Sequence, residues 1–418
     1  MITLHIIVPI LIISVVIFLL IIWALVAVLL LTRKKLVPEG TVTIKVNEDR
    51  VFEHERGVSL LRALSEHGVF VPSACGGAGT CGYCKGIIHS GGGDILPTEM
   101  THLSRKEVEK KYRLFCQVKV RDDMEIQIPE EIFGIKKWEC TVVSNENVAT
   151  YIKEFVLQMP EGEVLDFKSG SYIQIEIPEG KIRYSDMEIR EEYRTEWEQN
   201  RMFGLVASSS EWVTRAYSIA NHPAENNRIM LNVRVSPPPF NFKKKRFENV
   251  NPGIASSYIF TLKPGDKVTI SGPYGDFFIR ENENEMMFIG GGAGMAPMRS
   301  HIFDQFLTKQ TTRKTTFWYG GRSLRELFYI DDFERIEKEF PNFRFEVALS
   351  APLAKDNWKG KTGFIHQVIF DNYLKDHPNP EDIDYYICGP KLMSEAVIRM
   401  LDSLGVSEEH IFYDDFGN

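Results

Sequence analysis

The sequence predicts a multidomain protein with four parts: a single N-terminal transmembrane helix, a small α+β domain, an antiparallel β-barrel and an α/β domain with a parallel sheet. Three observations lead to this fold class. The chain begins with a long uncharged apolar run, its middle consists of short strands divided by Gly and Pro, and its last third alternates strand and helix. The expected boundaries are 1–36, 37–134, 135–282 and 283–418.

The N-terminal run has no charged residue from Ile6 to Leu31. Twenty-six helical residues extend about 39 Å, which exceeds the roughly 30 Å hydrocarbon core of a bilayer. A cleaved signal peptide is the alternative, but the run is long, lacks a basic start and precedes no small-residue cleavage site. Basic residues follow at Arg33–Lys35, so we expect a single-pass anchor with the body facing the cytoplasm. The helix holds no ionisable residue and offers no ion path by itself.

Charge and cysteine content narrow the class of function. The 418 residues carry a net charge of −8, so no nucleic-acid partner is expected. Four of the six cysteines fall between positions 75 and 116, whereas Cys140 and Cys388 stand alone. This clustering favours cysteines that act as metal or cluster ligands in a reducing compartment over cysteines that form structural disulfides. Cys140 is expected to pack in a core.

The α+β domain is expected from 37 to 134. Residues 41–48 alternate like a strand, and residues 58–68 read as a helix that ends at Gly68. A loop with three cysteines follows, and residues 113–120 and 124–129 are predicted to form short strands.

The cysteine loop has the spacing Cys75-x₅-Cys81-x₂-Cys84, with Cys116 more distant. Zinc sites usually present two similar pairs of ligands, so this set is lopsided for zinc. An iron–sulfur cluster needs four thiolates, and the loop's glycines let the backbone fold closely around such a cluster. We therefore favour a cluster over zinc or a plain or disulfide-bonded loop. The five-residue gap resembles the vertebrate-type ferredoxins, which implies a [2Fe–2S] cluster.

The central barrel is predicted from five short strand-like segments with turn residues between them, at 139–145, 155–160, 171–178, 229–235 and 266–277. A segment at 181–200, rich in charged and aromatic residues, interrupts them and is expected to lie over the barrel surface.

The last domain is predicted from strands at 285–292, 315–321, 343–350 and 384–390 that alternate with helical segments. The first strand runs into a glycine-rich loop before Pro297, which suits the first turn of a helix. Glycines and a helix N-terminus favour a phosphate, and a simple turn is the alternative. Cys388 is expected at the carboxyl end of a strand. The loop glycines are Gly290, Gly291, Gly292 and Gly294.

The stretch "RAYS" at 215–218 resembles the flavin signature of the ferredoxin–NADP⁺ reductase-like superfamily. The resemblance implies that Arg215 neutralises the flavin pyrophosphate, that Tyr217 stacks on the isoalloxazine and that Ser218 lies near flavin N5. In that superfamily the glycine loop binds a pyridine nucleotide, and Cys388 lies where its nicotinamide would sit. The terminal Phe416 is the candidate that covers the flavin, a frayed tail being the alternative.

A second candidate element of the flavin site is "PGIASSY" at 252–258. Gly253, Ser256 and Ser257 can offer backbone N–H groups and hydroxyls to a diphosphate at a helix start.

Taken over its whole length, the chain resembles the family of F subunits of Na⁺-translocating NADH:quinone reductases. The resemblance implies FAD, NADH as donor, and a bacterial inner (plasma) membrane location with membrane subunits as partners. Electrons would pass from NADH to FAD and through the [2Fe–2S] cluster to quinone reduced downstream. By the same resemblance Ser218, Cys388 and Phe416 are the catalytic candidates, and sodium transport belongs to the partner subunits.

Two other functions remain open from the residues. One is the membrane-tethered reductase component of a multicomponent oxygenase, and the other is a tethered electron-transfer or metal-binding protein without catalysis. The choice between NADH and NADPH is also open, since the expected ribose site holds both basic and acidic residues, namely Arg322, Ser323, Arg325 and Glu326.

Overall fold

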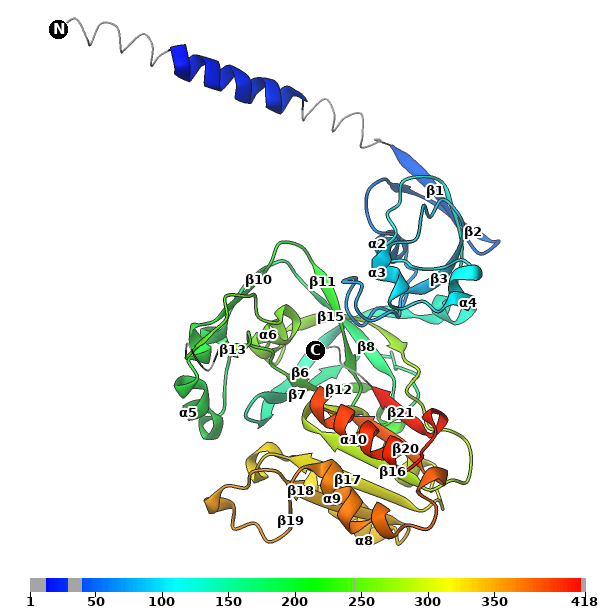
Figure 1. Cartoon of the computed structure of the whole chain (residues 1–418), viewed down its shortest axis with the longest axis vertical. Coiled ribbons are helices and arrows are strands. Elements are labelled where there is room, and N and C mark those ends of the chain that lie inside the picture. Colours follow the sequence, from blue (N-terminus) through cyan, green and yellow to red (C-terminus); the bar gives the residue numbers. More distant parts are fainter. Residues whose placement is uncertain (1–12, 29–39, 242, 244, 415–418) are drawn as a thin grey trace, which may run out of the picture. The chain divides into compact units, whose positions relative to one another are not determined.

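The computed structural model describes residues 13–28, 40–241, 243 and 245–414. The chain divides into two compact units (Figure 1). The first consists of Met1–Val71 and Cys84–Ile132, and the second of Pro72–Tyr83 and Phe133–Asn418. The loop Pro72–Tyr83, which carries two cysteines, is thus grouped with the second unit although its sequence neighbours belong to the first.

Residues 13–28 form a helix with exposed apolar side chains. In the part of the chain that the structure describes, no helix is long and apolar enough to cross a membrane. The expected span Ile6–Leu31 extends past the described helix at both ends.

The first unit is built on a five-stranded sheet in the order β2-β1-β5-β3-β4. Strands β1 and β5 pair in parallel and the other neighbours pair antiparallel. Alternate residues of β1 are buried, as its sequence pattern predicts. Helix α2 begins after Ser59, whose hydroxyl accepts a hydrogen bond from the Arg62 N–H, and the chain turns at Gly68 with φ +78°. The elements are β1 (Thr41–Val46), β2 (Arg50–Glu55), α2 (Leu60–Glu66), β3 (Lys85–Ser90), α3 (Pro97–Met100), α4 (Arg105–Glu109), β4 (Tyr112–Leu114) and β5 (Met124–Gln127).

The second unit contains a six-stranded antiparallel sheet in the order β11-β8-β15-β6-β7-β12. A bridge between Ile219 and Leu231 joins its two ends, so the sheet closes into a barrel. Cys140 is completely buried in the barrel core, as expected. The strands are β6 (Lys136–Ala149), β7 (Ile152–Gln158), β8 (Tyr172–Ile177), β11 (Val213–Ser218), β12 (Arg228–Arg234) and β15 (Lys267–Tyr274). Beside them lie β9 (Gly180–Arg183), β10 (Val206–Ser209), β13 (Phe240–Asn241), β14 (Arg246–Phe247) and α6 (Ile254–Thr261).

Segment 181–200 packs on the barrel, as expected, and also contributes side chains to its core. The segment forms β9 and helix α5 (Glu191–Gln199), and α5 buries Tyr193 and Trp197 in the same hydrophobic cluster as the barrel strands. These two aromatic residues are four positions apart, so they lie on one face of the helix while its charged residues face outward. Trp197 is fully buried, so the inner face of α5 belongs to the core while its outer face is exposed.

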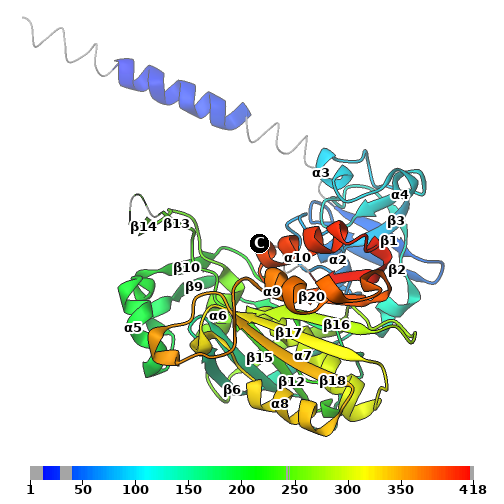
Figure 2. The ribbon, with the colours of Figure 1, turned by 60° about the horizontal axis from the view of Figure 1, so that its bottom comes forward.

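The rest of the second unit is an α/β sandwich around a parallel sheet in the order β19-β18-β17-β16-β20-β21. Helices α7 and α8 lie on one face and α9 and α10 on the other (Figure 2). Strand β16 is buried on both faces, which explains its continuous apolar sequence. The elements are β16 (Met286–Gly291), α7 (Met295–Phe303), β17 (Thr315–Gly321), α8 (Ile330–Glu339), β18 (Phe343–Leu349), β19 (Lys361–Thr362), α9 (Ile365–Asn372), β20 (Asp384–Cys388), α10 (Lys391–Ser403) and β21 (Ile411–Asp414).

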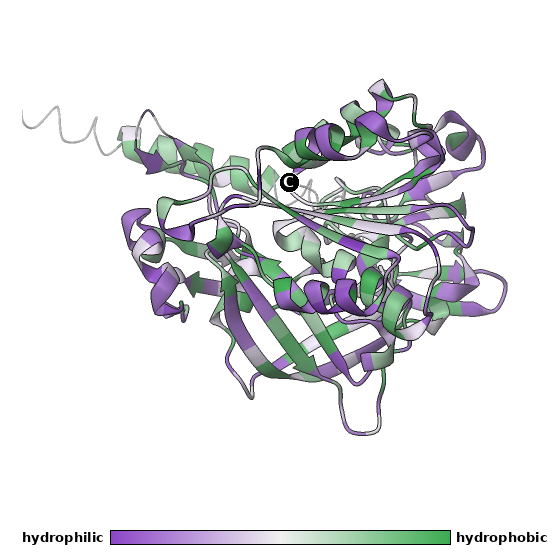
Figure 3. Ribbon diagram, turned by 90° about the horizontal axis from the view of Figure 1, so that it is seen from below, coloured by the Kyte–Doolittle hydropathy of each residue, from purple (hydrophilic) through white to green (hydrophobic). Residues whose placement is uncertain are grey.

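The small α+β unit, the antiparallel barrel and the parallel sheet with helices on both faces are therefore confirmed. Hydrophobic and hydrophilic residues are interspersed along helices of the second unit (Figure 3). Helix α8 buries Phe333 and Ile336 and exposes most of its charged residues, which is the pattern of one buried face, whereas every residue of α7 is buried. Strand β6 is longer than its apolar core suggested, because it continues to Ala149 and a tight turn before β7.

Candidate active site

The cysteine loop in the second unit brings two predicted ligands together. The Cys81 Sγ lies 3.3 Å from the Cys75 Sγ, and the hydrogen bond between the two thiols lowers the pKa of Cys75. The loop turns through left-handed glycines, among them Gly76 and Gly77 with φ +62° and +93°. The Gly77 N–H donates to the Ser73 hydroxyl at 3.0 Å. A pair of adjacent thiols suits the thiolate chemistry of an iron–sulfur cluster.

The other two predicted ligands, Cys84 and Cys116, are buried in the first unit. Cys84 immediately precedes β3, and its carbonyl accepts a hydrogen bond from the Phe115 N–H at 2.9 Å. No disulfide involves the cysteines of the described residues. Within these residues no group of three or more metal-ligating side chains is gathered.

Three predicted flavin residues lie on β11. The Arg215 guanidinium donates to the Thr214 carbonyl at 2.7 Å. The Tyr217 ring packs against the barrel core, and burial raises the pKa of its hydroxyl. Ser218 ends the strand, and its Oγ donates to Asp414 Oδ2 at 2.9 Å. This bond joins the barrel to β21 of the parallel sheet.

Helix α6 has Gly253 at its N-terminus, as the sequence indicated. The Ser256 hydroxyl accepts from the Ser236 N–H at 3.1 Å. The Ser257 hydroxyl is fully buried, 2.7 Å from the Gly253 carbonyl and 3.0 Å from the Tyr184 hydroxyl. Both hydroxyls therefore have partners inside the protein, which leaves the backbone N–H groups of the first turn as candidate donors to a diphosphate.

The glycine loop and Cys388 are brought together by the parallel sheet. Gly290 pairs with Cys388 across β16 and β20. A Cβ on Gly294 would lie 2.1 Å from the Cys388 carbonyl oxygen, and one on Gly291 would lie 3.0 Å from the Met393 Sδ. The loop, which includes Gly292, therefore packs directly on the chain that follows β20. Pro297 is the third residue of α7, in its first turn as expected.

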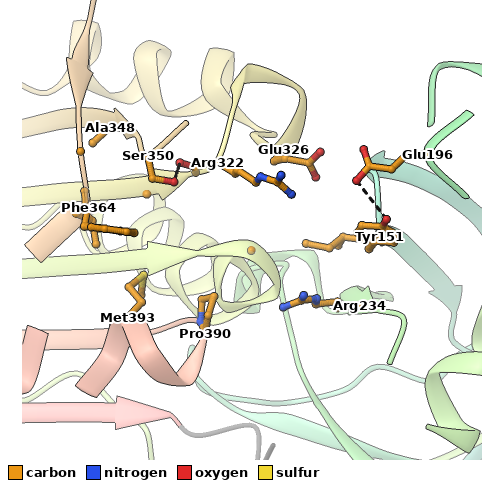
Figure 4. Close-up of a pocket in the computed structure, with 16 residues that line it drawn as sticks. Tyr151, Glu196, Arg234, Arg322, Glu326, Ala348, Ser350, Phe364, Pro390 and Met393 are labelled. Carbon is orange, nitrogen blue, oxygen red and sulfur yellow. Dashed lines mark hydrogen bonds between the residues drawn. The ribbon is translucent and has the colours of Figure 1, made fainter. Parts of the chain in front are cut away.

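A cavity of about 340 Å³ opens at the carboxyl ends of β16, β17 and β18 (Figure 4). Ligands of open α/β sheets bind at this edge. Part of the wall comes from the barrel, including Tyr151 in the turn between β6 and β7, and part from α5. The charged side chains that line the cavity are Glu196, Arg234, Arg322 and Glu326.

Some functional candidates were missed by sequence reasoning and one predicted residue is not described. Asp414 lies two residues before the predicted Phe416, and Glu196 lies in the charged segment 181–200, but the partners of both residues are distant in sequence. Phe416 lies outside the described residues. The structure thus brings Ser218, Cys388 and the glycine loop into one unit.

Comparisons with known families agree with this organisation. Residues 44–121 match the 2Fe-2S iron-sulfur cluster binding domain, residues 201–279 the oxidoreductase FAD-binding domain and residues 288–399 the oxidoreductase NAD-binding domain. The fold is similar to an Amycolatopsis cytochrome P450 reductase, with a TM-score of 0.63 over 90% of this chain and 99% of that one. At 24% identity, that likeness concerns the fold alone.

Two curated relatives extend over almost the full length. The F subunit of the Na(+)-translocating NADH-quinone reductase of Neisseria gonorrhoeae is 53% identical over 97% of this chain and 99% of its own. The relative of the same name in Klebsiella pneumoniae is 54% identical over the same shares. Identity at this level over nearly the entire length of both chains shows that the protein belongs to the family of Na⁺-translocating NADH-quinone reductase F subunits.

Proposed function

We propose that this chain is the electron-input subunit of a Na⁺-translocating NADH:quinone oxidoreductase. The observation that carries the proposal is the link between the two halves of the candidate hydride-transfer site. The Ser218 Oγ is bound to Asp414, and Asp414 pairs with Cys388 across β20 and β21. The residue assigned to the flavin and the residue assigned to the nicotinamide are thus connected through Asp414, which contacts Ser218 by its side chain and Cys388 by strand pairing.

When bound, FAD would supply the acceptance of a hydride from NADH and the release of single electrons to the [2Fe–2S] cluster. The chain's residues bind and orient these groups. Arg215 supplies positive charge for the flavin diphosphate, and the Tyr217 ring supplies a flat apolar surface. Because the Ser218 hydroxyl donates to Asp414, its oxygen is turned to accept a hydrogen bond from a ligand. Phe416 is assigned as a cover of the flavin that nicotinamide displaces.

The pyridine nucleotide is assigned to the edge of the parallel sheet. The glycine loop ahead of α7 offers backbone N–H groups to its diphosphate, and Cys388 marks the nicotinamide end. The cavity beside them has the mixed apolar and charged lining that a dinucleotide needs. The loop glycines are Gly290, Gly291, Gly292 and Gly294.

The cluster is assigned to the four cysteines within the matched 2Fe-2S domain. Their spacing and the close thiols of Cys75 and Cys81 support this assignment. Cys84 and Cys116 complete the set of four thiolates that such a cluster requires.

The remaining assignments concern organisation and location. We divide the chain into an anchor at 1–36, a ferredoxin domain at 37–134, an FAD-binding barrel at 135–282 and an NADH-binding domain at 283–418. The uncharged run Ile6–Leu31 and the basic residues after it support one span in a bacterial inner membrane with the body in the cytoplasm. Membrane subunits then receive the electrons, reduce quinone and move sodium.

The test is Na⁺-dependent, NADH-driven quinone reduction in native membranes with and without this chain. We expect the activity to vanish without the chain and to return when the full chain is restored. If quinone reduction is indifferent to the chain while the membranes still contain its NADH-reducible cluster, the acceptor is another protein. An oxygenase would then be the acceptor to examine.

A further inference from the structure

Helix α5, which the proposed reaction does not use, forms one wall of the nucleotide cavity. Trp197 anchors the buried face of the helix. Its indole N–H donates to the Thr150 carbonyl at 2.7 Å, and its ring is fully buried. The end of the helix is fixed by Asn200, which donates to the Tyr151 hydroxyl at 2.9 Å. The helix therefore holds a defined position beside the turn between β6 and β7, and Glu196 projects from it to the cavity (Figure 4).

The Glu196 carboxylate engages the loop that follows β17. One of its oxygens accepts a hydrogen bond from the Arg325 guanidinium, and the other accepts one from the Tyr151 hydroxyl at 3.2 Å. Arg325 also donates to the Thr150 hydroxyl at 3.0 Å. An arginine held in this way has its charge neutralised by a carboxylate and is turned toward α5.

Glu326, the next residue, is fixed by the same turn. Its two carboxylate oxygens accept hydrogen bonds from the Thr150 hydroxyl at 2.5 Å and the Thr150 N–H at 3.2 Å. Glu326 follows the second strand of the nucleotide domain along the chain and lines the cavity. In dinucleotide-binding sheets an acidic residue in this region binds the adenosine ribose hydroxyls, whereas an arginine accommodates a 2′-phosphate.

The charged side chains that line the cavity are two arginines and two glutamates, and one of the glutamates, Glu196, is paired with Arg325. Arg234 and Arg322 contribute two positive charges, and Glu196 and Glu326 contribute two negative charges. Removal of the Glu196 charge would leave the wall net positive and would also release Arg325 from its carboxylate partner on α5. Two arginines in one loop, Arg322 and Arg325, would then face a phosphate with less opposing charge.

We propose that Glu196, presented by α5, is a specificity-determining residue that makes the cavity accept a dinucleotide with unmodified ribose hydroxyls and reject one with a 2′-phosphate. The proposal rests on the proposed function, since it assigns the cavity to the pyridine nucleotide. A 2′-phosphate carries nearly two negative charges, and Glu196 disfavours it because the carboxylate neutralises Arg325 and holds this arginine toward α5, whereas an uncharged ribose diol does not need the arginine.

The test compares NADH and NADPH as donors to the purified full chain with its flavin bound, with ferricyanide as acceptor. We expect Glu196→Gln to raise the ratio of kcat/KM for NADPH to that for NADH about tenfold. The separate variant Glu196→Asp keeps the charge, so its NADPH-to-NADH ratio of kcat/KM should stay close to that of the wild type. The KM of Glu196→Gln for NADPH should also rise with ionic strength, because a charge interaction is screened by salt.

Glu198→Gln is the matched control. Glu198 lies on the same helix, is exposed and pairs with Arg194 outside the cavity, so both kcat/KM values should stay as in the wild type. An unchanged ratio in Glu196→Gln, or an equal loss with both nucleotides, would overturn the proposal. If the wild-type holoprotein oxidises neither nucleotide, the proposed function itself fails, and the two failures are thus distinguishable.

Discussion

The glycine loop packs closely against the end of β20 because Gly294 has no side chain. A methyl group there would lie 2.1 Å from the Cys388 carbonyl oxygen and 2.6 Å from the Gly389 nitrogen. Gly294 itself has an ordinary helical φ of −62°, so the need for glycine comes from this close approach and not from backbone strain. The loop assigned to the diphosphate and the residue assigned to the nicotinamide are therefore held at a fixed separation.

Gly294→Ala should lower kcat/KM for NADH about 100-fold, because a shift of about 1 Å between binding elements misplaces the reacting atoms. The measurement is NADH oxidation with ferricyanide by the flavin-loaded chain. Gly204→Ala is the control, since a Cβ at Gly204 meets no atom within 4 Å and its activity should match the wild type. Equal activities of the two variants would contradict the close packing assigned to the loop.

The contact between Ser218 and Asp414 could not be predicted from the sequence around either residue. The motif around Ser218 is recognisable from its own sequence, but its partner is 196 positions away. Such a pair depends on how the barrel and the last strand of the parallel sheet meet, and local patterns carry no information on that. Glu196 was missed for the same reason, because its partner Arg325 lies 129 positions away.

At the scale of elements, helix α6 is fixed at its C-terminal end by two buried side chains from the barrel. Asn145 donates to the carbonyls of Ile259 and Leu262 at 2.7 and 2.8 Å, and the Lys153 ammonium donates to the Phe260 carbonyl at 3.3 Å. A cation at this end interacts favourably with the helix dipole. The opposite end of α6 is the one assigned to the flavin diphosphate.

Lys153 makes the stability of the barrel depend on pH. Burial, which is the largest effect, lowers the pKa of Lys153 to about 8, whereas an unfolded lysine titrates near 10.4. Between these values the folded state binds fewer protons than the unfolded state, so the free energy of unfolding rises with pH. The gain ends where the unfolded lysine loses its own proton, and it amounts to about 3 kcal/mol at most.

Lys153→Met should therefore lose stability relative to the wild type as the pH is raised from 8 to 10. The measurement is urea unfolding of the full chain at the two pH values, followed by flavin fluorescence. Lys267→Met removes an exposed lysine that donates to Thr141 on the same barrel, and its difference from the wild type should be the same at both values. A constant difference for Lys153→Met would contradict the assignment.

Most elements could be predicted from local pattern. The apolar run of β16 indicated a strand buried on both faces, and the alternation in β1 indicated one buried face. The buried face of α5 was not predicted because charged residues dominate its sequence, although Tyr193 and Trp197 at a spacing of four carried the signal for it. The exact end of β6 depended on a turn that is fixed by Glu326, far along the chain.

At the scale of the whole molecule, the cofactor-binding parts have separate cores. The hydrophobic clusters of the barrel and of the parallel sheet consist of residues from Trp138 onward. The buried residues of the five-stranded sheet, such as Ile44 and Ile126, belong to the other unit. The motifs predicted the order of the three matched domains along the chain. No single motif predicts how the cluster and the flavin are arranged in space.

Cys75 lies in a loop of the second unit and is not a member of the hydrophobic cores of the barrel or the parallel sheet, which predicts that the cluster can be removed without loss of hydride transfer. Cys75→Ala should abolish the electron paramagnetic resonance signal of the reduced [2Fe–2S] cluster, because three thiolates cannot complete its coordination. NADH should still bleach the visible absorbance of the flavin, while quinone reduction in membranes that contain the variant should be lost. The measurement pairs both spectra on the same purified full chain.

Cys140→Ala is the matched control for this variant. Cys140 is a buried cysteine of the barrel, 3.7 Å from the Met159 Sδ, and is not assigned to the cluster, so its variant should keep the resonance signal and quinone reduction. A cluster signal that persists in Cys75→Ala would remove Cys75 from the ligand set. Loss of flavin bleaching in that variant would instead show that the barrel and nucleotide domain depend on the cluster for their fold, since electrons reach the flavin before the cluster in the proposed order.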